Sequence, residues 1–253
     1  MYTSISMSFN ESRKSPKKYF EWRKERSKNT VTKIEKFSSL KKAKVLEIGI
    51  GYGALSSLLL AKGALVTGTE ADIDSLKIAR ENLKNKRNFR LIEAKGNKLQ
   101  FKNNSYDIVI LFDVIEHVEK PDIMMKECVR VLKKGGLLYC EFTPYYSLIG
   151  HHLYDYAKWP IHILPKKLIK KIVLSKKDNT FFSNELSWKQ FESLNKLKVS
   201  EFQKMVINLK ILNQKFILKY PDLFEINLPF LNLLGQFKDI LCFSFEGFYR
   251  KLG

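Results

Sequence analysis

A regular alternation of short apolar runs and amphipathic segments between residues 44 and 142 limits what this chain can fold into. The apolar runs have the length of buried strands, and the segments between them carry apolar residues at helical spacing. Strict alternation of strand and helix predicts a parallel sheet with helices on both faces. The sequence therefore predicts a Rossmann-like, doubly wound α/β fold with strands at Lys44–Ile48, Leu65–Thr69, Phe89–Glu93, Tyr106–Phe112 and Leu137–Phe142, and helices at Ala54–Lys62, Asp72–Asn85 and Pro121–Leu132.

The segments on either side of this alternation are expected to complete a single domain, residues 1–253. We expect an N-terminal helical segment over residues 1–40, a core over residues 41–144, a helical and aromatic insertion over residues 145–215, and C-terminal strands over residues 216–253. The last strands bring the predicted sheet to seven mostly parallel strands. Within the flanking segments the sequence predicts one or two helices within 16–38 and helices at Ser187–Lys196 and Ser200–Asn213. It also predicts strands at Phe216–Tyr220 and Phe243–Arg250.

The formal net charge of +19 is the main anomaly of the composition. Such a field attracts phosphate groups, nucleic acids and anionic lipid headgroups. A general bias toward lysine explains the same charge equally well, because the lysines are spread along the chain and spread charge usually forms a solvated face. The charge alone therefore indicates no particular partner.

The cysteines and the N-terminus bear on the compartment. Cys128, Cys140 and Cys242 lie far apart in the chain, which argues against both a disulfide framework and a zinc site. The first ten residues are polar and lack the apolar centre of a secretion signal, and no apolar run is long enough for a spanning helix. We therefore expect a cytoplasmic protein.

A glycine-rich turn follows the first predicted strand, in Glu47-Ile-Gly-Ile-Gly-Tyr-Gly53. Glycines allow a tight turn there and let a ligand approach the backbone closely. Glu70 ends the second predicted strand about 20 residues later, where a carboxylate can accept hydrogen bonds from the two hydroxyls of a ribose. Taken alone, the turn is weak support for a site, because with Ala54 it also satisfies the dinucleotide-binding pattern.

Four segments together resemble class I S-adenosylmethionine-dependent methyltransferases, and most closely the group that includes the ubiquinone-biosynthesis O-methyltransferases. They are VLEIGIGYG (Val45–Gly53), VTGTE (Val66–Glu70), NSYDIVILFDVIEHV (Asn104–Val118) and VLKKGGLLYCEFTP (Val131–Pro144), in family order and at family spacing. The resemblance covers about two fifths of the chain and implies S-adenosyl-L-methionine as the cofactor. It favours methyl transfer over hydride transfer, because a nicotinamide enzyme needs no DVIEHV segment after its fourth strand.

The resemblance also implies roles for particular residues. Glu47 is expected near the methionine ammonium, and Glu70 on the ribose. The backbone at Gly49, Gly51 and Gly53 is expected to run close beside the cofactor, and Phe112 and Asp113 are expected to line its site. The acidic residue that the family commonly uses for the adenine amine is missing, so adenine recognition is assigned to Asn97, with Glu93 as the alternative.

Three histidines are candidate catalytic bases. His117 is the histidine inside the predicted fold core, and His151 and His152 follow the fifth strand in a segment expected to form a lid on the substrate side. A histidine suits proton transfer at neutral pH, whereas packing or capping would explain His117 equally well. No metal is expected, although the lid histidines with Asp155 offer metal-ligand types.

The leading hypothesis is methyl transfer to an oxygen atom of a small or medium-sized acceptor, such as a lipid, a quinone precursor or a glycan-type metabolite. Leu111-Phe-Asp-Val114 replaces the Asn-Pro-Pro-Tyr-like tetrapeptide expected of an enzyme that methylates a base amine. An RNA-modifying methyltransferase is an alternative that the charge suggests but no RNA-binding module supports. A non-catalytic binding protein is the other alternative, and Lys166–Lys177 has the pattern of a helix in peripheral contact with a membrane.

Overall fold

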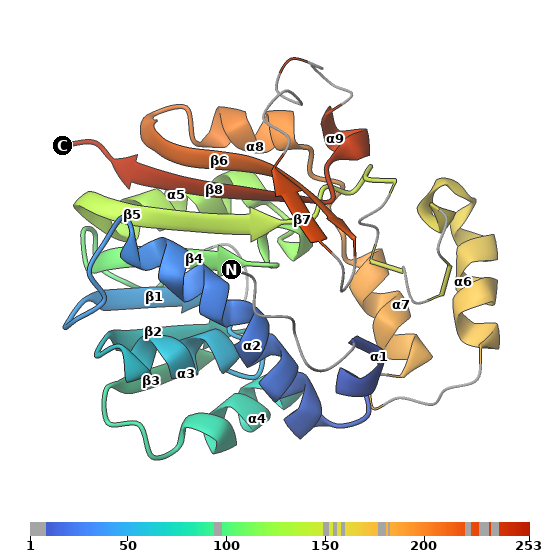
Figure 1. Ribbon diagram of the computed structural model, residues 1–253, viewed down its shortest axis with the longest axis horizontal. Helices are drawn as coiled ribbons and strands as arrows, with labels where there is room; N and C mark the ends of the chain where they lie inside the picture. The colour runs from blue at the N-terminus through green and yellow to red at the C-terminus, as the bar shows by residue number, and fades with distance from the viewer. Residues whose placement is uncertain are drawn as a thin grey trace.

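The chain forms an eight-stranded sheet with the strand order β3-β2-β1-β4-β5-β8-β6-β7 (Figure 1). The computed structural model describes residues 9–93, 98–148, 152, 153, 156, 157, 160–176, 181, 183–220, 224–227, 233 and 238–253. The strands are β1 (Lys44–Ile48), β2 (Leu65–Glu70), β3 (Phe89–Glu93), β4 (Tyr106–Phe112), β5 (Leu132–Phe142), β6 (Leu209–Tyr220), β7 (Phe224–Asn227) and β8 (Ser244–Lys251).

The first five strands are parallel, as the alternation of strands and helices predicts. The chain starts in the middle of the sheet at β1, extends outward through β2 and β3, and then crosses to β4 on the other side of β1. The carboxyl ends of β1 and β4 therefore flank the point where the strand order reverses, which is where open α/β sheets bind their ligands. The strands β8, β6 and β7 extend the sheet in antiparallel pairing.

Helices cover both faces of the sheet. On one face α2 (Pro16–Glu35) and α3 (Ala54–Ala61) pack on a core that includes Ile108 and Ile110. On the other face α5 (Pro121–Val131) and α8 (Val199–Met205) pack on a core that includes Val109 and Leu111. Alternate side chains of β4 thus enter opposite cores, which explains why its sequence is a continuous apolar run. The helix α4 (Ile73–Leu83) lies beside β2 and β3.

A third, smaller core holds the insertion together. It joins η2 (Ile161–Ile163), α6 (Lys166–Ser175) and α7 (Asn184–Glu192) around the buried side chains of Leu153, Tyr156, Ile161, Ile169, Val173, Trp188 and Phe191. The short helices α1 (Phe9–Ser12) and α9 (Lys238–Leu241) and the 3-10 turn η1 (Ile115–His117) complete the described elements. No helix among the residues that the structure describes is both long and apolar enough to cross a membrane.

Several predicted boundaries differ from the structure. The helix predicted at Ser200–Asn213 is wrong in its second half, because α8 ends at Met205 and β6 begins at Leu209. Pairing of β6 with β8 supplies backbone hydrogen bonds that outweigh the local helical pattern. The sheet also has an eighth strand, β7, in addition to the seven that the sequence predicts. The fifth strand begins at Leu132 rather than Leu137, and residues 16–35 form one helix with Ser15 as its N-cap.

Candidate active site

The glycine-rich turn connects β1 to α3 at the carboxyl edge of the sheet. Gly49, Gly51 and Gly53 all adopt positive φ angles of 66°, 53° and 83°, which favour glycine over other residues. A side chain at Gly49 would come within 2.6 Å of Val114, and one at Gly53 within 2.7 Å of Leu83. At Gly51 nothing lies within 4 Å of an added Cβ. The outer glycines therefore allow close packing, whereas the middle one borders open space.

Glu70 meets this turn from the neighbouring strand. Its Oε2 accepts a hydrogen bond of 2.8 Å from the backbone N–H of Gly51, and its Oε1 accepts bonds from the N–H groups of Ala71 and Asp72. Asp72 is the N-cap of α4, because its Oδ2 accepts a bond from the N–H of Ser75. The two features that the sequence predicted to act together are thus in direct contact.

Glu47 lies buried at the end of β1, and its Oε2 accepts a hydrogen bond of 2.6 Å from the Ser56 hydroxyl. Burial raises the pKa of this carboxyl to about 7, although the Ser56 hydroxyl and the Arg23 guanidinium oppose the shift. A positively charged group placed beside Glu47 would relieve this cost, because it would favour the ionised carboxylate. The position is therefore suited to an ammonium ligand.

Two arginines of α2 cover the end of β4. Arg23 Nη1 lies 2.7 Å and Arg26 Nη1 3.1 Å from Asp113 Oδ2, and Arg26 Nη2 lies 3.3 Å from Glu141 Oε1. Both guanidinium groups stand over the Phe112 ring, 4.7 Å and 5.0 Å from its centroid. Burial would raise the pKa of Asp113, but Arg26 and Arg23 outweigh it and hold that pKa well below its usual range. Asp113 also has a positive φ of 58°, so this ion-pair cluster holds it in a costly backbone conformation.

The sequence did not single out Arg23 and Arg26 as site residues. They lie about 90 residues before Asp113 in the chain, and only the packing of α2 on the sheet brings the charges together. Their spacing was the one signal that the sequence offered, because residues i and i+3 lie on the same face of a helix and two arginines there can act together.

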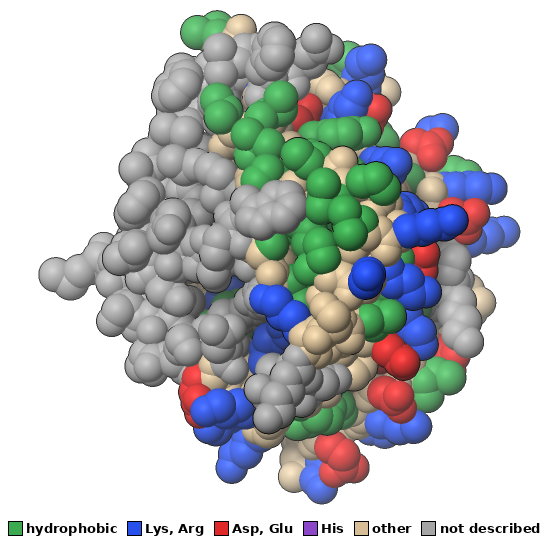
Figure 2. Space-filling model, turned by 90° about the vertical axis from the view of Figure 1, so that its right-hand side faces the viewer, with side chains coloured by type: hydrophobic (Ala, Val, Ile, Leu, Met, Phe, Trp, Pro, Cys, Tyr) green, Lys and Arg blue, Asp and Glu red, His purple; other side chains and the backbone are tan. Residues whose placement is uncertain are grey.

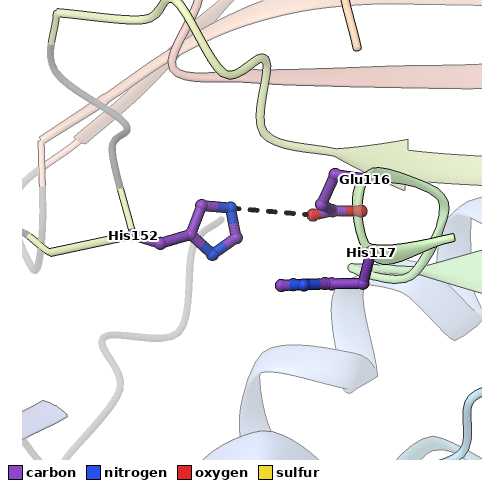
Figure 3. Close-up of side chains that lie close together, drawn as sticks. All are labelled: Glu116, His117 and His152. Carbon is purple, nitrogen blue, oxygen red and sulfur yellow. Dashed lines mark ion pairs between the residues drawn. The ribbon is translucent and has the colours of Figure 1, made fainter. Parts of the chain in front are cut away.

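A second group of side chains gathers just beyond β4, where Glu116, His117 and His152 point toward one another (Figure 3). Glu116 is only 2% exposed; its Oε1 accepts a long bond of 3.4 Å from the N–H of Thr143 and lies 4.0 Å from His152 Nε2. The His117 and His152 rings meet edge to face at 5.2 Å, and His117 Nδ1 is 2.9 Å from the Ser193 hydroxyl. The structure thus brings together two of the three predicted bases.

The protonation of this group follows from its burial. Burial raises the pKa of Glu116 well above its ordinary value, with the nearby Asp113 charge acting in the same direction. Burial lowers the pKa of His117, against a weaker opposing influence of Asp113. Both shifts favour neutral forms, so His117 is an available proton acceptor at neutral pH. The ligand atoms of Glu116, His117 and His152 also lie within 4.8 Å of one another and could hold a divalent cation, so the expected absence of a metal stays a prediction.

The other residues that the sequence predicted for the site fall into three groups. Phe112 lies buried at the end of β4, beneath the two guanidinium groups, and Glu93 ends β3 opposite Glu70. Asn97 and His151 lie outside the described residues, so their predicted roles stay predictions. The other predicted residues gather at the carboxyl ends of β1, β2 and β4: Glu47, Gly49, Gly51, Gly53, Glu70, Asp113, His117 and His152.

Comparison with known proteins assigns this arrangement to a family. A methyltransferase domain model matches residues 46–140, which run from within β1 into β5 and include the glycine-rich turn and β2 to β4. Residues 46–140 belong to the class I S-adenosylmethionine-dependent methyltransferase superfamily. The methyltransferase domain therefore has the fold and the cofactor, S-adenosylmethionine, that the sequence resemblance implied.

The relatives of the methyltransferase domain agree with this assignment. A ubiquinone biosynthesis O-methyltransferase from Coxiella burnetii is 29% identical over 140 residues, which are 53% of this chain and 57% of that protein. The chain thus matches little more than half the length of this curated relative. Two solved structures share the fold. The PH0226 protein from Pyrococcus horikoshii has 21% sequence identity and a TM-score of 0.58, and the match covers 99% of this chain and 94% of that one. Magnesium protoporphyrin IX methyltransferase from Synechocystis with bound SAH has 16% identity and a TM-score of 0.57, and the match covers 99% of this chain and 90% of that one.

Proposed function

We propose that the protein transfers a methyl group from S-adenosylmethionine to an oxygen atom of a small or medium-sized acceptor. The observation that carries this proposal is the contact between the Glu70 carboxylate and the Gly51 backbone, beside a position where an added side chain would meet nothing. An adenosyl group needs both a carboxylate for its ribose diol and backbone free of side chains. The family assignment of the domain supports the same cofactor.

The charged groups of the site match the charged groups of the cofactor. Glu47 offers a buried carboxylate to the ammonium of the methionine part, and Glu70 offers its oxygens to the ribose hydroxyls. Arg23 and Arg26, both paired with Asp113, are proposed to bind the carboxylate of the methionine part as well. The bound cofactor supplies a methyl group already activated by its sulfonium, so the protein must mainly orient the acceptor and accept its proton.

His152 and His117 are proposed to take the proton from the acceptor hydroxyl, with His151 a further candidate. Two of these imidazoles, those of His117 and His152, lie in contact just beyond the end of β4. An oxygen nucleophile needs such a base because a hydroxyl is a poor nucleophile until its proton is removed. A lipid, a quinone precursor or a glycan-type metabolite is the proposed acceptor class, and the name of the Coxiella relative agrees with oxygen as the target.

The test is transfer of isotope-labelled methyl from S-adenosylmethionine to extracted metabolite pools, followed by a pH profile with the acceptor found. Because burial lowers the pKa of His117, the base should stay neutral below the ordinary histidine range, and transfer should persist at pH values below 6.5. Replacement of His117 or His152 by Asn should lower the rate about 100-fold with unchanged cofactor affinity.

His162→Asn is the matched control, because His162 is another buried histidine of the insertion, packed against Tyr145, and its replacement should affect neither the rate nor its pH dependence. Full transfer by both His117→Asn and His152→Asn would remove these residues from the mechanism. Absence of labelled product in every pool, with cofactor bound, would overturn the proposed transfer.

A further inference from the structure

The amino edge of the sheet is densely basic. In a doubly wound sheet the loops entering the parallel strands lie at the edge opposite the cofactor, at the left-hand end of the sheet in Figure 1. The antiparallel β8 ends at the same edge, because its Arg250 pairs with Leu137 near the start of β5. The basic residues that this arrangement brings together are Lys41, Lys42, Lys44, Lys62, Lys84, Lys86, Arg87, Arg90, Lys102, Lys133, Lys134, Lys210, Arg250 and Lys251.

Few acidic residues balance this edge. Glu35, Glu81 and Asp107 pair with Lys62, Lys84 and Lys133. Within the described part of the chain no carboxylate lies within 4.0 Å of the exposed side chains of Lys41, Lys42, Lys86, Arg87, Arg90, Lys102 and Lys134.

The opposite edge of the sheet differs in charge. Buried carboxylates of Glu47, Glu116 and Glu141 gather there. Figure 2 shows the right-hand side of the molecule, where Asp and Glu side chains stand beside the Lys and Arg side chains. Basic side chains on this side thus stand among acidic ones, whereas the amino edge has few acidic residues.

A cleft of about 400 Å³ opens within the basic edge, between the starts of β2, β3 and β4. The exposed side chains of Arg87, Arg90 and Lys44 line this cleft. Asn88 and Ser105 add neutral polar groups to the cleft wall. Guanidinium groups bind phosphate oxygens through two parallel hydrogen bonds, and amides and hydroxyls complete such contacts.

We propose that the amino edge of the sheet binds the phosphate backbone of a single-stranded nucleic acid, with Arg87 and Arg90 in the cleft as its main contacts. Seven strands from β3 to β6 span roughly 29 Å at the usual spacing, which is enough for several successive phosphates.

This inference does not depend on the proposed methyl transfer. The edge lies about one strand length, roughly 17 Å, from the glycine-rich turn at the carboxyl ends of the strands. A nucleic acid held there is attached to the protein without being presented to His117 and His152, the proposed bases. Cofactor binding and nucleic-acid binding should therefore be separable by mutation.

The test measures the fluorescence anisotropy of a labelled single-stranded RNA of about twelve nucleotides, titrated with the full chain at several salt concentrations. Wild type should bind with an affinity that falls steeply with salt. The double variant Arg87→Glu/Arg90→Glu should bind at least about tenfold more weakly, and its salt slope should fall by about 1.4, which corresponds to two lost phosphate contacts. Both arginines are exposed and have no described ion pair, so the variant should retain its fold and its affinity for S-adenosylhomocysteine.

Lys166→Glu/Lys167→Glu is the matched control, because it makes the same change in net charge at exposed positions of α6 in the insertion. The control should weaken RNA binding less than about twofold. Equal weakening by both variants would show an effect of net charge alone and overturn the proposal. So would RNA binding that persists unchanged in Arg87→Glu/Arg90→Glu while binding to vesicles of anionic lipid is lost.

Discussion

At pH 8 the Glu47→Gln variant is expected to be more stable than wild type by about 3 kcal/mol at most, while its affinity for S-adenosylmethionine falls at least tenfold. Burial raises the pKa of Glu47 from an ordinary value of 4.5 to about 7. The folded protein therefore retains a proton that the unfolded chain releases, and stability is lost as the pH rises from 4.5 through 7. Glutamine removes this loss but also removes the charge proposed to hold the cofactor ammonium.

Urea denaturation at pH 4.5 and pH 8 checks the first part, and calorimetry checks the second. At pH 4.5 the two proteins should differ little, because folded wild type is then protonated at Glu47. A gain in stability that is equal at both pH values would contradict the assignment of the shifted pKa to Glu47. Cofactor affinity that is unchanged in Glu47→Gln would contradict its proposed contact with the ammonium.

Replacement of Arg26 by Ala is expected to lower the free energy of unfolding by about 3 kcal/mol. The change leaves Glu141 without its guanidinium partner and leaves Asp113 with Arg23 alone. Glu141 is only 7% exposed, so the uncompensated carboxylate is costly in the folded state. Because α2 is held to the sheet partly through these pairs, cofactor binding should weaken as well.

The double variant Arg26→Ala/Glu141→Gln separates charge from packing. It should recover at least about 1 kcal/mol of the loss, because the buried negative charge is gone. Arg80→Ala is the control, since Arg80 is an exposed arginine of α4 whose removal should change stability by less than about 0.5 kcal/mol. A loss in Arg26→Ala no greater than in Arg80→Ala would show that the buried ion pairs contribute nothing.

The parts of the site that could be predicted from the sequence are those built from neighbouring segments of the chain. Gly51 and Glu70 are only 19 residues apart, in one strand–helix–strand unit whose geometry places both at the same edge. The strands β1, β3 and β4 were predicted with the bounds that the structure shows, because each is a short segment rich in apolar residues between polar turns. The local sequence pattern is therefore sufficient to predict residues that the topology of one strand–helix–strand unit brings together.

The parts that could not be predicted depend on contacts between distant segments. Arg26 and Glu141 are 115 residues apart, and nothing in the surroundings of either residue indicates the other. Glu116 was overlooked beside His117, because burial of its carboxylate depends on how the end of β5 packs against η1. The strand β6 was partly predicted as helix because its pairing with β8, and not its own periodicity, decides its conformation. The concentration of charge at the amino edge likewise follows only from topology.

The most direct measurement of the central claim is calorimetric titration of the protein with S-adenosylhomocysteine. Wild type should bind it, and Glu70→Ala should bind at least about tenfold more weakly, because a hydrogen bond to a charged group is lost together with its support of the Gly51 turn. Asp74→Ala should bind like wild type, since Asp74 is an exposed acid in the first turn of α4. Equal affinity of wild type and Glu70→Ala would contradict the placement of the cofactor between Gly51 and Glu70.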